Sequence, residues 1–91
     1  MIDEPLTDAE LDAIEARVVA ASKVPWQSFV EGRDHTSGDN FIRVGGLDDD
    51  EPDMYVSRDT VPASVADQDF IAHARRDMPR LLAEVRGLRA R

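Results

Sequence analysis

The chain has no cysteine, few aromatic residues and no long apolar run, and these absences exclude several classes of protein. Without cysteine there is no disulfide framework, no thiol catalysis and no cysteine-ligated zinc site. No apolar stretch approaches the roughly 20 residues that cross a membrane. The opening residues, Met1 to Pro5, lack the basic and apolar regions of a signal peptide. We therefore expect a cytoplasmic protein that does not bind membranes.

The length and composition are those of a small folded domain. The chain has 91 residues, of which 42% are apolar and 33% are charged, which is ordinary for a globular protein. A chain this short buries only about 60–65% of its unfolded surface, so its core must be small. We predict one domain over residues 1–91, with a flexible start at 1–5 and a frayed end at 86–91.

The net charge of −8 is distributed unevenly along the chain. Residues 1–69 carry 17 acidic and 5 basic side chains, whereas residues 70–91 carry 2 acidic and 6 basic ones. The acidic part repels nucleic-acid phosphates and attracts basic surfaces. We expect no nucleic-acid partner; if the charge selects a partner at all, it selects a basic protein.

A helix is predicted from Thr7 to about Ser22. Thr7 and Glu10 have the spacing of a capping box, in which each side chain bonds the other residue's backbone N–H. An apolar stripe follows at helical spacing, formed by Leu11, Ile14, Val18 and Ala21. Pro25 disfavours helical geometry in the residue before it, so the helix should end a few residues earlier.

The middle of the chain has the composition of short strands and polar loops. We predict strands at 26–31, 40–44 and 54–57, separated by a polar loop at 32–39 and an acidic turn at 47–53. Loops of this length favour an antiparallel meander. Trp26 is expected to close the core; an exposed binding anchor is the alternative.

A second helical region begins near Ser64 or Asp67, both of which are suitable caps. It carries a heptad stripe formed by Ile71, Ala74, Met78, Leu81, Val85 and Leu88, widened by Phe70 and Leu82. Pro79 interrupts the helix and costs roughly 3 kcal/mol in an unadjusted one. The region should therefore be either a kinked helix or two helices, the second capped by Asp77.

These elements predict an α+β fold. An N-terminal helix and a kinked or split C-terminal helix should pack on one face of a three-stranded antiparallel sheet. The expected core consists of Leu11, Ile14, Val18, Trp26, Ile42, Val44, Ile71, Ala74, Met78, Leu81 and Val85.

The sequence offers little catalytic or metal-binding chemistry. Counted from Asp48 as an EF-hand loop, the sixth position is Asp53 and the twelfth is Asp59, where glycine and glutamate are required. Asp34, His35 and Asp39 could form only a weak metal site on a polar loop. There is no nucleophile elbow and no phosphate-binding glycine loop. We predict no enzyme activity, no catalytic or metal-binding residue and no cofactor.

Parts of the chain resemble a family of small phage and prophage proteins from GC-rich bacteria, likened to ead-type phage early-region proteins. The resemblance lies in Leu6 to Ala21, in the pair Pro25-Trp26, and in Asp69 to Arg89, which together make up under half of the chain. It implies a role on a mobile element or as an accessory protein, and it carries no catalytic residues.

Two functions follow as hypotheses. The first is a non-catalytic interaction module that forms a homodimer through its C-terminal helix. The apolar stripe is longer than short strands can cover, so Leu82, Val85 and Leu88 should extend beyond the domain and bind a partner. The competing outcome is that this end folds back onto the first helix and leaves a monomer.

The second hypothesis is an acidic inhibitor, or immunity-type protein, that neutralises a basic toxin or a nucleic-acid-processing enzyme. Its partner-binding residues would be Asp48, Asp49, Asp50 and Glu51 in the acidic turn. The alternative for these four side chains is a solvated turn without a partner.

Overall fold

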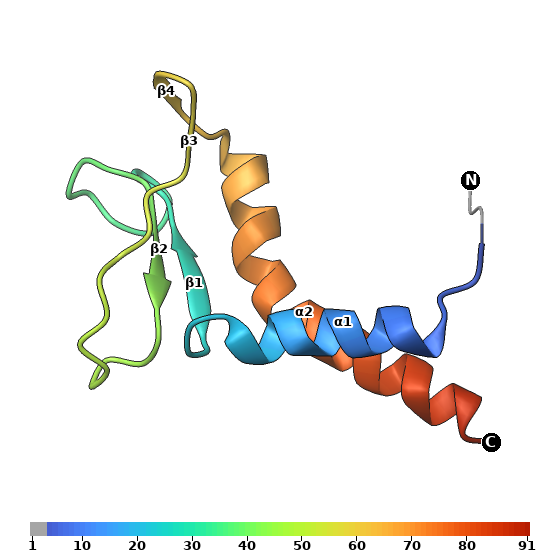
Figure 1. Ribbon diagram of the computed structural model, residues 1–91. Coiled ribbons are helices and arrows are strands. Elements are labelled where there is room, and N and C mark those ends of the chain that lie inside the picture. Colours follow the sequence, from blue (N-terminus) through green and yellow to red (C-terminus); the bar gives the residue numbers. More distant parts are fainter. Residues whose placement is uncertain (1–3) are drawn as a thin grey trace. The chain divides into compact units, whose positions relative to one another are not determined.

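The computed structural model describes residues 4–91 and confirms the α+β class (Figure 1). Its elements are α1 (Asp8–Ala20), β1 (Trp26–Phe29), β2 (Phe41–Val44), β3 (Ser57–Arg58), β4 (Val61–Pro62) and α2 (Val65–Arg89). The chain forms two compact units, Ser22–Asp77 and a helical unit that combines Met78–Arg91 with the chain up to Ala21. The flexible start expected at residues 1–5 lies mostly outside the described residues.

The first helix begins at the predicted capping box. The Glu10 N–H donates to Thr7 Oγ1 over 3.0 Å, and the Thr7 N–H donates to Glu10 Oε1 over 2.8 Å. Acidic residues in the first turn favour the positive end of the helix dipole. The helix ends at Ala20, two residues before the predicted end, and Ala21 caps it in an extended conformation.

Strands β1 and β2 pair antiparallel, with Trp26 opposite Val44 and Phe29 opposite Phe41. The prediction of a third strand in this sheet is wrong. Met54 makes one bridge to Ile42, in which each N–H donates to the other's carbonyl over 2.8 Å. The next hydrogen-bonded pair would place Pro52 opposite Val44, and proline has no N–H to donate. The ladder therefore stops after one bridge.

A second two-stranded sheet replaces the rest of the predicted third strand. β3 and β4 pair antiparallel, with Arg58 opposite Val61, and Asp59 in the turn between them has a left-handed φ of 52°. The Val56 carbonyl accepts from the Ala63 N–H over 2.9 Å, so it continues the pairing of the second sheet. The sequence gives little sign of this hairpin, because its turn contains neither glycine nor asparagine.

The turn after β2 requires glycine. Gly45 has φ +80°, and a Cβ added to it would lie 3.0 Å from the Asp49 Cβ. The Asp49 carboxylate reaches back over this space and accepts from the Gly46 N–H over 2.7 Å. The Gly45 N–H donates to the Pro25 carbonyl over 2.8 Å, which ties the turn to the start of β1.

The C-terminal helix begins at Val65, and Ser64 caps it by accepting from the Asp67 N–H over 3.1 Å. It continues through Pro79 as one helix. The alternative of two helices, with Asp77 as a second cap, is therefore wrong. Proline removes a single intrahelical bond, and contacts on both sides of it can offset that loss.

The buried residues match the predicted core only in part. Leu11, Ile42 and Val44 are buried, and most of the other expected residues are half-buried. The prediction that Met78 and Leu81 belong to the core is wrong, because they are 42% and 60% exposed. Besides Gly45, five further residues are buried that the pattern did not assign to the core: Val30, Ala63, Gln68, Ala72 and Leu82.

Candidate interaction surface

The helical unit is an antiparallel pair formed by α1 and the C-terminal part of α2. Arg86 donates to Asp12 over 3.0 Å and to Glu15 over 2.9 Å, and Arg89 lies 3.7 Å from Asp8. Residue numbers rise along one helix as they fall along the other, so the two helices run in opposite directions. The hydrogen bond to Asp12 is the main reason that the pKa of Arg86 is raised.

The interior of this pair is apolar and small. Leu11 of α1 is 2% exposed and Leu82 of α2 is 9% exposed. Ile14, Val18 and Val85 are half-buried. The end of α2 therefore already has an intrachain partner in α1, as the competing outcome of the sequence analysis stated.

One apolar face of α2 remains exposed in this unit. Met78, Leu81 and Leu88 are 42%, 60% and 54% exposed, and half-buried Val85 completes their spacing of three, four and three. This is the spacing of the a and d positions of a coiled coil. Exposed apolar side chains are ordinary singly, whereas a continuous row on one helix indicates an interaction site. We call these four residues the α2 stripe.

The structure therefore changes which residues could bind a partner. Of the predicted residues Leu82, Val85 and Leu88, the first is buried against the molecule's own interior and cannot be an external contact. Leu81, which the pattern placed in the core, is exposed and replaces Leu82 as a candidate contact residue. Adjacent leucines differ by about 100° around a helix, and the sequence showed an apolar stripe wide enough to include both.

The acidic turn contains two kinds of carboxylate. Asp48, Asp50 and Glu51 are exposed, and none has a side-chain hydrogen bond or ion pair within the part of the chain that the structure describes. Asp49 is engaged, because it accepts from the Gly46 N–H and lies 3.1 Å from Lys23 Nζ. Both contacts lower the pKa of Asp49, and the hydrogen bond from the Gly46 N–H has the larger effect. Asp49 therefore shapes the turn, and of the four predicted partner-binding carboxylates only Asp48, Asp50 and Glu51 are free to bind.

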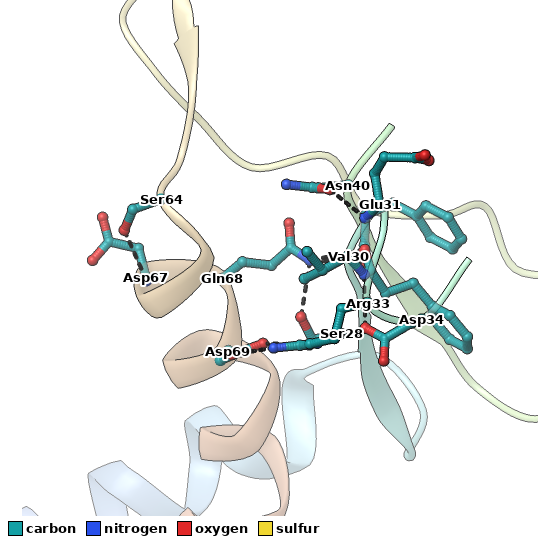
Figure 2. Close-up of polar contacts among 12 residues, drawn as sticks. Ser28, Val30, Glu31, Arg33, Asp34, Asn40, Ser64, Asp67, Gln68 and Asp69 are labelled. Atoms are coloured by element: carbon teal, nitrogen blue, oxygen red, sulfur yellow. Dashed lines mark hydrogen bonds and ion pairs between the residues drawn. The ribbon is translucent and has the colours of Figure 1, made fainter. Parts of the chain in front are cut away.

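A polar network joins α2 to the first sheet (Figure 2). The Gln68 side chain is 1% exposed, and its Nε2 donates to Ser28 Oγ over 2.9 Å and to the Phe41 carbonyl over 3.1 Å. A longer bond of 3.3 Å runs to the Phe29 carbonyl. A single buried glutamine thus bonds both strands, a role that sequence periodicity could not reveal.

A neighbouring ion pair supports the same contact. Arg33 donates two parallel bonds to Asp69, of 2.9 and 3.0 Å, and a third bond of 2.9 Å to Asp34. Arg33 and then the Ser28 hydroxyl lower the pKa of Asp69 to about 2. The Asp34 carboxylate accepts from the Val30 N–H over 2.8 Å, which is the main reason that its pKa is also lowered.

The polar loop does not assemble a metal site. Asp34 is committed to the Val30 N–H, and His35 Nδ1 accepts from the Ser37 N–H over 3.0 Å. The His35 ring packs against both Phe29 and Phe41, with centroids 6.4 and 5.2 Å away. Within residues 4–91, no group of three potential ligands is placed to hold a metal ion.

Neither helix of the described chain is long and apolar enough to span a bilayer. Comparisons of the chain with protein-family models, with curated proteins and with solved structures found no match. The resemblance to phage proteins therefore stays a prediction, and any function must be argued from the surfaces described above.

Proposed function

We propose that the protein is a non-catalytic interaction module that forms a homodimer through the α2 stripe. The observation that supports this most directly is the exposure of Met78, Leu81 and Leu88 in one row of a helix. A second copy offers the same row, so one surface can serve both subunits of a two-fold dimer. Pairing two such helical pairs would give a four-helix arrangement with the stripes at its centre.

The size of the stripe predicts a weak, concentration-dependent dimer. Complete burial of a leucine or methionine side chain contributes about 1.5–3 kcal/mol, and these side chains are about half-exposed to begin with. Their combined contribution must offset an association cost of at least about 4 kcal/mol. We therefore expect a dissociation constant in the micromolar range.

Size exclusion with light scattering tests the proposal. At about 100 µM, a concentration that populates micromolar complexes, the mass should exceed the monomer's 10.1 kDa and approach twice that value. Leu81→Glu should return it to the monomer, because the dimer would bury an unpaired charge.

Ala83→Glu is the matched control for this test. It adds the same charge to an exposed position of the same helix, about 200° around the axis from Leu81. This variant should associate as the wild type does. A wild-type mass of 10.1 kDa at that concentration would rule out the dimer, as would equal effects of the two substitutions.

A second candidate function is neutralisation of a basic protein, the acidic-inhibitor hypothesis. The observation that favours it is the set of exposed, unengaged carboxylates at Asp48, Asp50 and Glu51. Charge of this kind accelerates encounter with a cationic surface and is sensitive to salt. If the turn carries this function, replacing the three carboxylates by amides should slow association with a basic target, measured by stopped flow at low salt.

A further inference from the structure

We propose that a groove in Ser22–Asp77 binds the cationic side chains of an extended, arginine-bearing protein segment. The groove has a volume of about 630 Å³ and lies between the polar loop, the β3–β4 hairpin and the start of α2. Ligand sites commonly fall in the range of about 300–1,000 Å³. This inference goes beyond self-association, because no lining residue belongs to the α2 stripe.

All the charged side chains that line the groove are acidic. Glu31, Asp39 and Asp59 contribute carboxylates, and no lysine, arginine or histidine is among the lining residues. Asp39 and Asp59 have no side-chain hydrogen bond or ion pair within residues 4–91. The surrounding unit, residues 22–77, carries 12 acidic and 6 basic side chains, so the wider field also favours a cation.

The loop that carries Asp39 is held in place from both sides. The Gly38 N–H donates to Glu31 Oε1 over 2.6 Å, and Asn40 Oδ1 accepts from the Glu31 N–H over 2.8 Å. Figure 2 shows Asn40 directed at Glu31. Asp39 lies between these two anchored residues, so its carboxylate is presented without a large ordering cost on binding.

The second carboxylate comes from the hairpin. Asp59 lies in the turn between the paired residues Arg58 and Val61, at a positive φ that aspartate tolerates better than most residues. The groove therefore receives one carboxylate from each of two fixed turns. Arginines two positions apart in an extended segment lie on one face and could each meet one of these groups.

The walls suit the rest of an arginine side chain. Tyr55 and Val61 line the groove and are 62% and 56% exposed. Arginine buries its aliphatic stem along such surfaces while its charged end stays hydrated. An aromatic face also attracts a guanidinium. A small anion or a purely apolar peptide would lack one of these contacts.

NMR titration of the full-length protein tests the proposal. The ligand is an acetylated, amidated heptapeptide with two arginines alternating with alanines, used at 0.15 M salt. Amide shifts should concentrate at residues 31, 39, 55 and 59–61. The same peptide with citrulline in place of arginine has nearly the same shape without the charge and should not bind. Binding should be equal in the Leu81→Glu variant, which separates this site from self-association.

Variants of the two unengaged carboxylates complete the test. The double variant Asp39→Asn with Asp59→Asn should weaken binding by roughly 3- to 20-fold, as expected for the loss of two exposed ion pairs. Asparagine also tolerates the backbone of residue 59. Asp53→Asn, an exposed carboxylate outside the groove, should change affinity by less than about 2-fold because salt screens it.

Several outcomes would overturn the proposal that the groove binds an arginine-bearing segment. One is absence of binding up to several millimolar peptide, and another is equal binding of the citrulline peptide. Unchanged affinity in the double variant would also do so. Shifts centred on residues 48–51 would assign the basic segment to the acidic turn instead, which would support the second candidate function and exclude the groove.

Discussion

Gln68 is a polar side chain in a position where an apolar one would ordinarily be found. It is 1% exposed and donates to the carbonyls of Phe29 and Phe41 as well as to Ser28. A buried amide without hydrogen-bond partners costs free energy, so these bonds are what allow Gln68 to be buried. It joins α2 to both β1 and β2, because its Nε2 lies within hydrogen-bond distance of a carbonyl on each strand.

We expect Gln68→Ala to lower the free energy of unfolding by about 1–3 kcal/mol, because it removes the hydrogen bonds of a buried amide to Ser28 and to both strands. Urea denaturation followed by circular dichroism measures the change. Gln27→Ala is the control, because Gln27 is exposed on β1, and it should remain within about 0.5 kcal/mol of the wild type. A loss below that margin for Gln68→Ala would mean that water replaces the amide.

The adjacent leucines of α2 give a second prediction at this scale. Leu82→Ala should cost about 2–5 kcal/mol because Leu82 is buried, whereas Leu81→Ala should stay within about 1 kcal/mol. The comparison is made by urea denaturation at low micromolar protein, where a weak dimer contributes little. If Leu81→Ala cost more stability than Leu82→Ala, the core predicted from the sequence would be the correct one.

At the scale of elements, local chemistry sets where the two helices begin, whereas their packing depends on residues that are distant in the sequence. The capping box starts α1 and Ser64 starts α2, and both signals lie within four residues of the helix. The course of α2 through Pro79 has a different origin. Its first part is joined to the sheet through Gln68, and its last part is joined to α1 through Arg86. Contacts on both sides offset the bond lost at the proline.

Removal of the first cap tests how much α1 depends on it. Thr7→Ala should destabilise the protein by about 0.5–2 kcal/mol, because the Glu10 N–H loses its acceptor. Thermal denaturation followed by helical circular dichroism detects this as a lower midpoint. Thr36→Ala, in the exposed polar loop, should leave the midpoint unchanged. Equal midpoints for wild type and Thr7→Ala would show that α1 does not limit stability.

At the scale of the whole molecule, charge is the dominant property. The net charge is −8, and several carboxylates hold the structure together while others face solvent. Asp34, Asp49 and Asp69 accept hydrogen bonds that favour their ionised forms, so their pKa values are lowered. A carboxyl whose pKa is lower in the folded than in the unfolded chain stabilises the fold above its unfolded pKa.

Acid should therefore destabilise the protein over a defined range. The pKa of Asp69 is about 2 in the fold, against about 3.9 in an unfolded chain. Its contribution is complete above about pH 5 and is lost as the pH falls towards 2. Urea midpoints across this range should show Asp69→Asn less stable than wild type at pH 7, with most of the difference lost near pH 2. A difference that persists undiminished at pH 2 would mean that ionisation of Asp69 is not its source.

The sequence by itself determined the features that depend on neighbouring residues. The capping box at Thr7, the pairing segments around Trp26 and Phe41, the glycine turn and the α+β class all follow from local patterns. In each, the deciding interaction lies within a few residues, or within a hydrophobic period that the chain displays directly. The apolar character of α2 was likewise visible, and with it the idea of an interaction surface on that helix.

Only the tertiary structure decided which side of each element is used. The apolar pattern in the sequence of α2 includes both Leu81 and Leu82, and the placement of α1 selected Leu82 for burial. The third strand failed because Pro52 would lie opposite Val44, which becomes evident once the register is known. Gln68 bonds Ser28 across 40 residues of sequence, and Arg33 bonds Asp69 across 36. Contacts of that separation depend on the geometry of the folded chain, and no local pattern encodes them.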